Sequence, residues 1–365
     1  MPDNPKGLDL KPTHLEKFRI IVSKLLKPVS IIVVQFDPDG CASALLVQAI
    51  LETLGVEAAV FYGGNIDRTQ NQVIFNNFDL KDKIKPLTEL PGQGSIILVD
   101  SSKIQDPRFG VPIAAERIDI AIDHHQENQV SCRTDKDRWV WIAPVGAATT
   151  LVWRLWAELN KETPVKVDET MATMAALGVY SDTDKLRSSR TTSADRQAWC
   201  EAMEMGGQEL FEKCSAYLLP KRCQLLLQKT LERSVDIGPY RIAHPNCLLH
   251  DDEGGQIAAL ADDIHRYEEV SATIVWGIVN NQIRFSVRMR SSESMNDLIA
   301  DLFGKGAGGG KHNASGGGIV PIPASFLPTD DLSDNLIKYI ESLLISKLKK
   351  RTGAPKEPVA PAETK

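Results

Sequence analysis

The chain has 365 residues, of which 42% are hydrophobic and 25% are charged, enough apolar material for two or three domains with buried cores. Its net charge of −6 and its pI near 5.7 exclude the overall basic field of a protein that binds long duplexes, so any phosphate must be recognised locally. The chain has no apolar run of the roughly 18 to 20 residues that a membrane span needs, and its first residues lack the apolar core of a secretory signal. We therefore expect a cytoplasmic protein that does not bind membranes.

Strand-like and helix-like segments alternate along the first part of the chain. Continuous apolar runs typical of buried strands lie at residues 29–36, 58–62, 95–99 and 118–122. Apolar residues at helical spacing lie at residues 43–54, 147–160 and 167–179. A parallel, doubly wound α/β sheet fits this alternation best. We assign residues 1–207 to this first domain.

The rest of the chain predicts a connector, a smaller domain and a tail. Residues 208–235 are amphipathic and interrupted by Pro220, which is typical of a helical connector. A mixed α/β domain is expected over residues 236–328, with strands at 270–278 and 282–290 joined by a tight Asn280–Asn281 turn and a glycine-rich loop at 304–318. A helix and a disordered tail are expected over residues 329–365.

Acidic and histidine residues directly follow several of the predicted strands. They are Asp37, Asp39, Asp100, Asp123, His124 and His125. The carboxyl ends of parallel strands meet at one edge of a sheet, so these side chains are expected to converge there, and we expect Asp37 and Asp39, two apart on an extended segment, to point the same way. Carboxylates and imidazoles are ligands for Mn²⁺, Mg²⁺ or Zn²⁺, and Asp100 suits a bridge between two ions.

Each of these residues also has a structural interpretation. An aspartate at the end of a strand is often a helix cap, which is an alternative for Asp39. His124 and His125 are alternatively one packed and one exposed histidine. Asp182 lies where a helix-like run stops, so it is a further ligand candidate or a cap.

Four short motifs carry a resemblance to a known family. FDPDGCAS at 36–43, LVDSS at 98–102, IDHH at 122–125 and YSDTD at 180–184 resemble, in order and spacing, the motifs of the DHH phosphoesterase family. The first motif is similar to that of RecJ-type exonucleases, and the length is similar to that of the oligoribonuclease and nucleotide-phosphatase branch. The second domain resembles the accessory DHHA1-type domain of the same family.

The resemblance implies roles for particular residues. Metal-ligand positions are Asp37, Asp39, Asp100, His124 and Asp182. Asp123 and His125 fall beside the ions, where they support ligands or contact phosphate, and they complete the catalytic set. Substrate-binding positions in the second domain are Ser286, Arg288, Gly309, Gly310, Lys311 and His312. The implied cofactors are two divalent metal ions, Mn²⁺ first and Mg²⁺ as the alternative.

One position departs from the family pattern. Many members carry a metal-binding histidine four residues before the first aspartate of the first motif, where this chain has Val33. The nearby Gln35 has a neutral amide, which is a poor replacement for imidazole at a transition-metal site. The departure predicts weaker binding of one ion.

The combined pattern predicts a metal-dependent phosphoesterase. We expect it to hydrolyse phosphodiester or phosphomonoester bonds in short single-stranded oligonucleotides or small nucleotides, such as dinucleotides and 3′-phosphoadenosine 5′-phosphate, by two-metal activation of water. Exopolyphosphate or pyrophosphate hydrolysis is one alternative, and a non-catalytic nucleotide-binding sensor is another. The sequence is compatible with a homodimer but has no feature that requires one.

Overall fold

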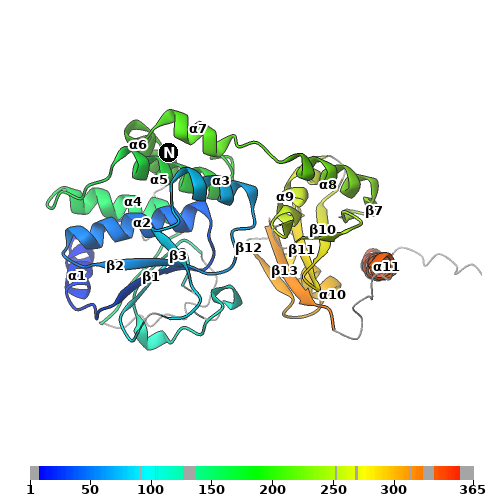
Figure 1. Cartoon of the computed structure of the whole chain (residues 1–365), viewed down its shortest axis with the longest axis horizontal. Coiled ribbons are helices and arrows are strands. Elements are labelled where there is room, and N and C mark those ends of the chain that lie inside the picture. The colour runs from blue at the N-terminus through cyan, green and yellow to red at the C-terminus, as the bar shows by residue number, and fades with distance from the viewer. Residues whose placement is uncertain are drawn as a thin grey trace, which may run out of the picture. The chain divides into compact units, whose positions relative to one another are not determined.

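The computed structural model describes residues 8–90, 92–102, 104, 106–125, 137–250, 253–267, 270–311, 315–323 and 333–353. The chain forms two compact units (Figure 1). Unit 1 comprises residues 1–66 and 70–217, and unit 2 comprises residues 67–69 and 218–365.

Unit 1 is built on a six-stranded sheet. Its strands are β1 (Val29–Val33), β2 (Ala58–Tyr62), β3 (Ile84–Pro86), β4 (Ile96–Val99), β5 (Ile118–Asp123) and β6 (Trp139–Ile142). They lie in the order β3-β2-β1-β4-β5-β6, and every neighbouring pair is parallel. The predicted parallel α/β sheet is confirmed. The short strands β3 and β6 are additions at its two edges.

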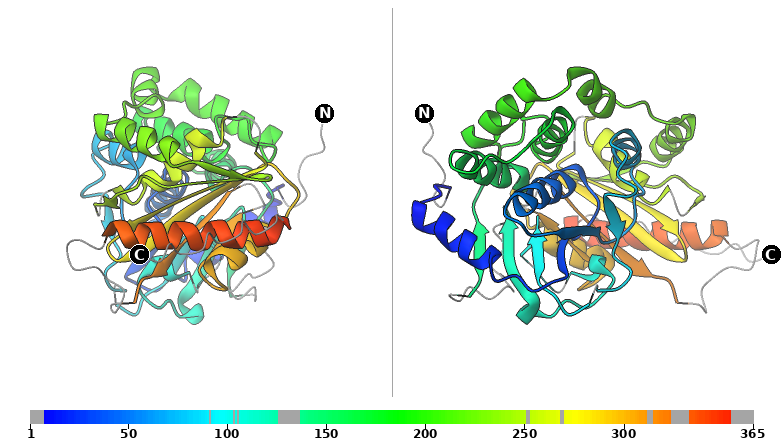
Figure 2. Two further views of the ribbon diagram at one scale, coloured as in Figure 1. Left: turned by 90° about the vertical axis from the view of Figure 1, so that its right-hand side faces the viewer. Right: turned by 60° about the vertical axis from the view of Figure 1, so that its left-hand side comes forward.

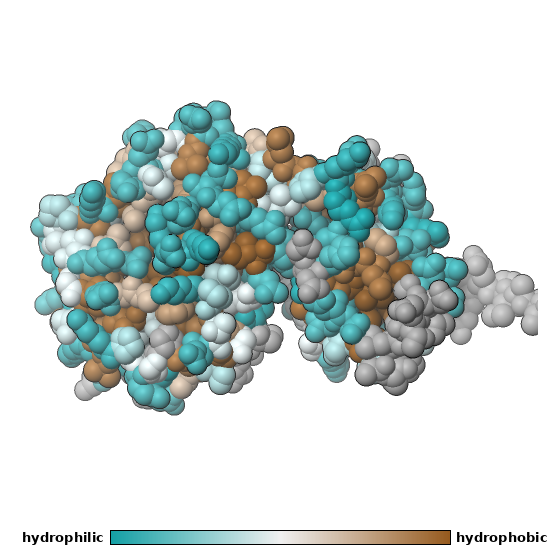
Figure 3. Space-filling view, viewed as in Figure 1, coloured by the Kyte–Doolittle hydropathy of each residue, from teal (hydrophilic) through white to brown (hydrophobic). Residues whose placement is uncertain are grey.

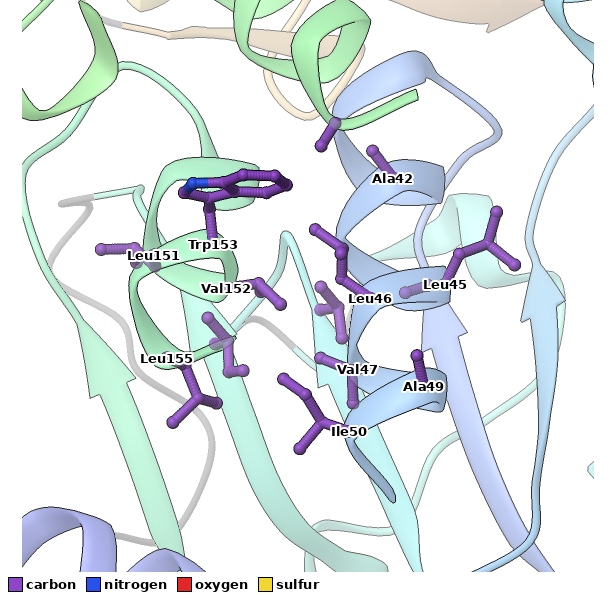
Figure 4. Close-up of a cluster of buried hydrophobic side chains, with 14 of the residues drawn as sticks. Ala42, Leu45, Leu46, Val47, Ala49, Ile50, Leu151, Val152, Trp153 and Leu155 are labelled. Atoms are coloured by element: carbon purple, nitrogen blue, oxygen red, sulfur yellow. The ribbon is translucent and has the colours of Figure 1, made fainter. Parts of the chain in front are cut away.

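Both faces of this sheet are covered, because successive side chains of a strand point to opposite faces. Ile31 and Val33 of β1 belong to the large core cluster that includes the helices, whereas Ile32 and Val34 belong to a smaller cluster on the other face with Phe109. Figure 4 shows side chains of two helices in the large cluster facing one another above the strands. Because both faces are buried, the strands consist of continuous apolar runs in the sequence.

Most of the helices of unit 1 lie on one side of the sheet (Figure 1). They are α1 (Pro12–Val22), α2 (Pro38–Thr53), α3 (Thr69–Asn77), α4 (Ala148–Asn160), α5 (Glu169–Asp182), α6 (Ser193–Met205) and α7 (Gln208–Ser215), with short 3₁₀ turns η1 (Pro107–Phe109) and η2 (Ala115–Arg117). Gly178 of α5 permits close packing, since a Cβ there would lie 2.6 Å from Oγ1 of Thr149 and 3.0 Å from Cβ of Ala42. This contact joins α5 to both α2 and α4.

Helix α2 begins earlier than the sequence pattern predicted. Asp37 is its N-cap, in an extended conformation, and Pro38 is its first residue. Proline is favoured at that position because its missing N–H would have no helical partner. The expectation that Asp37 and Asp39 lie on one extended segment and point the same way is therefore wrong.

Unit 2 has a mixed sheet with helices on both faces. Its strands are β7 (Val235–Ile237), β8 (Tyr240–Ala243), β9 (Leu248–Leu249), β10 (Ala272–Val279), β11 (Gln282–Met289), β12 (Gly308–Lys311) and β13 (Ser315–Pro321). Its helices are α8 (Lys221–Glu232), α9 (Gln256–Ile264), α10 (Met295–Phe303) and α11 (Ser333–Thr352). The predicted hairpin is confirmed: β10 and β11 are antiparallel, and Asn280 and Asn281 have φ values of 48° and 58°.

Two helices cover each face of the unit 2 sheet. Side chains of α10 and α11 pack with Trp276 and Phe285 in one cluster, and those of α8 and α9 pack with Val275 in another. Figure 2 shows α11 lying across the strands. The segment predicted as a connector contains α7 of unit 1 and α8 of unit 2, and Pro220 is the N-cap of α8.

The glycine-rich segment at 304–318 is not the loop that the sequence suggested. Most of it forms the antiparallel pair β12 and β13, with Gly309 opposite Gly317. A Cβ at Gly308 would lie 2.2 Å from the carbonyl oxygen of Gly317, so the absence of side chains allows the close approach of the two strands. Residues 312–314, which join them, lie outside the described residues.

The surface of unit 1 in Figure 3 mixes apolar and hydrophilic residues. In the described parts of the chain, none of the helices combines the length and the apolar composition that a membrane crossing requires.

Candidate metal centre

The carboxyl edge of the unit 1 sheet positions three of the predicted residues. Asp39 follows β1, Asp100 follows β4 and His124 follows β5. From β1 the chain first adds β2 and β3 on one side and then crosses to add β4, β5 and β6 on the other, so the direction of winding changes between β1 and β4. In open α/β sheets a ligand site forms beyond the carboxyl ends of the strands at such a point. Asp182, the last residue of α5, adds a fourth side chain from a helix.

These four side chains meet around one imidazole nitrogen. Nε2 of His124 lies 3.2 Å from Oδ1 of Asp100, 3.2 Å from Oδ2 of Asp182 and 3.8 Å from Oδ2 of Asp39. Ligand atoms of Asp39, His124 and Asp182 all lie within 4.8 Å of one another, as do those of Asp100, His124 and His125. The structure thus brings together residues from four separate motifs.

The other ring nitrogen of His124 determines which way the imidazole faces. Nδ1 lies 3.1 Å from the carbonyl oxygen of Val145, an acceptor, so Nδ1 carries the proton and donates it. Nε2 then faces the carboxylates, and its lone pair becomes available to a metal ion when its proton is lost. Metal-binding histidines are oriented in this way by a hydrogen bond from the second nitrogen.

Asp39 is both a cap and a member of this group. Its two carboxylate oxygens accept hydrogen bonds from the backbone N–H groups of Ala148 (2.7 Å) and Thr149 (2.8 Å), at the start of α4. Burial and then the charges of Asp100 and Asp182 nevertheless raise the pKa of Asp39 well above its ordinary value. Asp39 therefore binds the start of α4 and is not the cap of the helix that follows β1, because the N-cap of α2 is Asp37.

The electrostatic field at His124 is strongly negative. Burial alone would lower the pKa of His124, but the close contact with Asp100 and the charges of Asp182, Asp100 and Asp39 raise it to about 10. Three carboxylates around one imidazole favour any positive charge at that point. A divalent cation satisfies this field better than a single proton.

The donor set fits a divalent cation. Nε2 of His124 and Oδ2 of Asp182 are buried and make no hydrogen bond to any described residue, although they lie 3.2 Å apart. Buried polar atoms are normally paired, and acceptors that face one another without a donor are explained by a cation between them. Carboxylate oxygens with one imidazole suit Mn²⁺ or Zn²⁺.

Asp123 and His125 form a supporting pair beside this group. Asp123 accepts a hydrogen bond from Oγ of Ser102 (2.7 Å) and lies 2.5 Å from Nδ1 of His125. Burial would raise the pKa of Asp123, but the hydrogen bond and the charge of His125 lower it. The Asp123 carboxylate is thus occupied by these donors, while Nε2 of His125 is buried without a hydrogen bond to a described residue.

Asp37 and Val33 are two further positions of the first motif region. Oδ1 of Asp37 accepts the backbone N–H of Gly40 at 2.8 Å, and Asp37 is in neither group of close ligand atoms among the described residues. Val33 is buried inside β1, beside Tyr62 and Val99 in the sheet.

In unit 2, Ser286 and Arg288 are neighbours on β11. Nη1 of Arg288 donates to Oγ of Ser286 (2.7 Å), while Nε and Nη2 donate to the carboxylate of Asp262 at 2.5 and 3.0 Å. This bidentate pair occupies most of the donors of Arg288.

The glycine-rich residues predicted to bind substrate lie in and after β12. Gly309 has open space, since a Cβ there would meet only Oδ1 of Asn296 at 3.5 Å, and the backbone N–H of Gly310 donates to the same oxygen at 3.0 Å. Lys311 is the last residue of β12, and His312 lies outside the described residues.

Two family matches cover most of this architecture. Residues 30–179 match the DHH family, N-terminal domain, and residues 247–344 match the DHHA1 domain. The chain belongs to the DHH family. The members of this family are metal-dependent phosphoesterases. The family expected from the sequence is thereby confirmed.

Individual relatives of this DHH chain are distant. It is 25% identical over 329 residues to an uncharacterized protein of Methanocaldococcus jannaschii, covering 88% of this chain and 63% of that protein. It is 25% identical over 202 residues to a probable manganese-dependent inorganic pyrophosphatase of Streptococcus mutans, covering 55% of this chain and 62% of that protein. The matches thus span less than two thirds of either relative.

One solved structure resembles nearly the whole DHH chain. It is an exopolyphosphatase-related protein from Bacteroides fragilis, with a TM-score of 0.66 at 15% identity, and the match covers 93% of this chain and 98% of that one. At this identity the likeness concerns the fold.

Sequence reasoning missed Asp195, which supports the metal-centre loop of this DHH chain. The buried carboxylate accepts hydrogen bonds from the backbone of Gly146 (2.9 Å), from Oγ1 of Thr150 (2.6 Å) and from both the backbone and side chain of Thr192 (2.7 Å each). It therefore ties α6 to the loop that carries Val145. The signal was present as a capping box, in which Thr192 is followed three residues later by an acidic residue.

Proposed function

We propose that the chain hydrolyses phosphodiester or phosphomonoester bonds in short single-stranded oligonucleotides or small nucleotides, such as dinucleotides and 3′-phosphoadenosine 5′-phosphate. The proposal depends on one observation above all: the carboxylates of Asp39, Asp100 and Asp182 lie within 3.2 to 3.8 Å of the Nε2 atom of His124. The acidic net charge of −6 agrees with small rather than duplex substrates.

The proposed cofactors are two divalent ions, with Mn²⁺ preferred and Mg²⁺ as the alternative. Asp39, Asp100, His124 and Asp182 would hold them, and Asp37 would be a further ligand from the first motif. When bound, such ions supply positive charge for the phosphoryl oxygens and a water of lowered pKa as the nucleophile. The manganese dependence stated for the pyrophosphatase relative supports this choice of metal.

The protein groups would hold and orient the reactants. His124 is fixed by its hydrogen bond to Val145, so its Nε2 lone pair keeps one direction. Asp123 orients His125, whose buried Nε2 is left to hold a proton or contact a phosphate oxygen beside the ions. None of these steps needs a covalent protein nucleophile.

We assign the substrate contacts of unit 2 to Ser286, Arg288, Gly309, Gly310, Lys311 and His312. The open space at Gly309 supports a close approach of phosphate to the backbone. Arg288 is already paired with Asp262, so its part in binding would be to orient Ser286 or to exchange partners when substrate enters.

Hydrolysis of pyrophosphate or polyphosphate is a second candidate. It is favoured by the pyrophosphatase relative, whose 25% identity extends over 202 residues. A non-catalytic nucleotide sensor is the third candidate. It is suggested by Val33, which stands where many family members have a metal-binding histidine.

The deciding experiment uses the purified full chain with Mn²⁺. We expect release of mononucleotide or phosphate from a panel of linear dinucleotides and 3′-phosphoadenosine 5′-phosphate, and slower turnover of pyrophosphate and tripolyphosphate. A reversed order of rates would favour the second candidate. Tight nucleotide binding without turnover of any compound would contradict the proposed hydrolase and support a sensor. Metal analysis by mass spectrometry in the same samples gives the number of bound ions.

A further inference from the structure

Arg108 is held firmly near the carboxyl edge of the unit 1 sheet. It lies in η1, whose next residue, Phe109, is buried in the core cluster with Ile32 and Val34 of the β1 segment. Gly63 permits the close approach of this turn, because a Cβ there would lie 2.5 Å from the carbonyl oxygens of both Arg108 and Val34. The backbone of Arg108 is therefore placed by packing.

The guanidinium of Arg108 is oriented by two neighbours. Its Nε and Nη2 donate to the carboxylate of Asp106 at 2.9 and 2.7 Å, and its Nη1 lies 3.3 Å from Oε1 of Gln35. A guanidinium has five N–H groups, and its contacts with described residues use three, which leaves one N–H group on each terminal nitrogen for a ligand. The side chain is 51% exposed, so the remaining donors are accessible to a ligand.

Arg108 also lies in the field of the metal-centre carboxylates. Burial acts to lower its pKa, but the hydrogen bond and charge of Asp106, followed by the charges of Asp37 and Asp100, raise it. The guanidinium also contacts Gln35, which precedes Asp37 by two residues, so Arg108 lies beside the first motif of the site. A phosphate drawn to cations at this centre would meet carboxylates on several sides, and a neighbouring guanidinium offsets that repulsion.

We propose that Arg108 contacts the substrate directly, using its two remaining N–H groups to bind phosphate oxygens beside the metal centre. This inference rests on the proposed function, since it assigns a phosphate to the same site. It places a phosphate contact within unit 1, in addition to those assigned to unit 2. Asp106 is then a positioning residue that orients the guanidinium, and Gln35 assists it.

The test compares Arg108→Gln and Arg108→Lys with Arg19→Gln as a matched control. Arg19, in α1, pairs with Glu162 at 2.8 Å, and neither residue belongs to the metal centre. For the nucleotide substrate that turns over fastest, we expect Arg108→Gln to raise KM about tenfold to a hundredfold with a much smaller change in kcat. Arg108→Lys keeps the charge but loses the planar donor pair, so we expect an intermediate KM.

A second measurement does not need turnover. Titration of inorganic phosphate into the Mn²⁺-loaded chain by calorimetry should show binding that Arg108→Gln weakens about tenfold and Arg19→Gln leaves unchanged. Mn²⁺ affinity should not fall in any of these variants, because Arg108→Gln removes a positive charge and leaves the acidic ligands in place. Failure of the wild type to hydrolyse any nucleotide, with this phosphate difference intact, would overturn the proposed function but not the role of Arg108. Equal KM and equal phosphate affinity in Arg108→Gln and Arg19→Gln, or no phosphate binding by the wild type, would overturn the role of Arg108.

Discussion

His124 in unit 1 and His265 in unit 2 lie in electrostatic environments of opposite sign. In unit 1, carboxylates outweigh burial and raise the pKa of His124 to about 10. In unit 2, burial and then the charges of Arg290 and Arg288 lower the pKa of His265 to about 4, against the smaller effect of Asp262. The first environment favours cations and the second disfavours them.

The two regions also differ in how their polar atoms are paired. Around His124, buried ligand atoms face one another without hydrogen bonds to described residues. Around Arg288, the carboxylate of Asp262 and the hydroxyl of Ser286 already accept the guanidinium donors. Acceptors without a donor mark a place that a cation completes, whereas the donors of Arg288 already have partners within the protein.

The largest effect should come from removing a charge at the metal centre. Asp100→Asn keeps the shape of the side chain but removes an anionic ligand, so we expect Mn²⁺ affinity and turnover to fall at least about a hundredfold. The matched control is Asp184→Asn, because Asp184 belongs to the fourth motif but is 67% exposed and paired with Arg187 at 3.1 Å. If calorimetry showed the same Mn²⁺ affinity for Asp100→Asn as for the wild type, the carboxylate of Asp100 would have no metal-binding role.

The second effect is a pH dependence of metal binding. The folded-state pKa of His124 is raised from 6.5 to about 10. The protonated imidazole therefore stabilises the folded state, and this contribution is fully present below pH 6.5 and is lost as pH rises through about 10. Mn²⁺ must displace this proton, so we expect affinity to increase about tenfold per pH unit between pH 7 and 9. Titrations in buffers of different ionisation enthalpy would count the released proton. An affinity independent of pH would contradict this field around His124.

A smaller effect should appear in unit 2 when its ion pair is removed. Arg288→Met deletes charged hydrogen bonds to Asp262 and Ser286, and we expect a loss of about 2 kcal/mol in unfolding free energy, limited because Asp262 is 52% exposed. Arg266→Met is the control, since that pair is 3.6 Å long and Arg266 is 69% exposed. Hydrogen exchange of the β10 and β11 amides would report the difference. Equal protection in the two variants would show that the Arg288 pair adds no stability.

The smallest effect concerns acidification of unit 2. The depressed pKa of His265 means that its neutral form is favoured in the fold, so stability is present above pH 6.5 and is lost as pH falls through 6.5 towards 4. Because the side chain is half-buried, we expect no more than about 1 kcal/mol between pH 7 and 5. Urea unfolding at the two pH values, compared with His265→Gln, measures it. The same slope in the variant would assign the loss to other groups.

Much of the fold follows from local patterns. The buried strands of a parallel sheet have apolar side chains on both faces, so β1, β2, β4 and β5 were recognisable without neighbours. The Asn280–Asn281 turn was recognisable because asparagine tolerates positive φ. By contrast, β12 resembled a loop, because its glycines pack against another glycine-rich strand rather than showing an apolar face.

The residues of the site divide in the same way. Local sequence singled out Asp39, Asp100 and His124 because each follows a strand whose apolar run is visible in the sequence. The same reasoning expected Asp37 and Asp39 to lie on one extended segment and point the same way, which is wrong because α2 begins at Pro38, between them. Asp195 and Arg108 had no strand to mark them, since their positions depend on contacts with distant loops.

The amino-acid order alone thus determined which segments are strands and helices and which ligand-type side chains stand at their ends, since both depend on near neighbours. Only the tertiary structure decided which of those atoms meet. The distance of 3.2 Å between His124 and Asp182 depends on α5 lying close to α2 and α4, which Gly178 permits. Such distances arise from packing between segments far apart in the chain, and no local pattern encodes them.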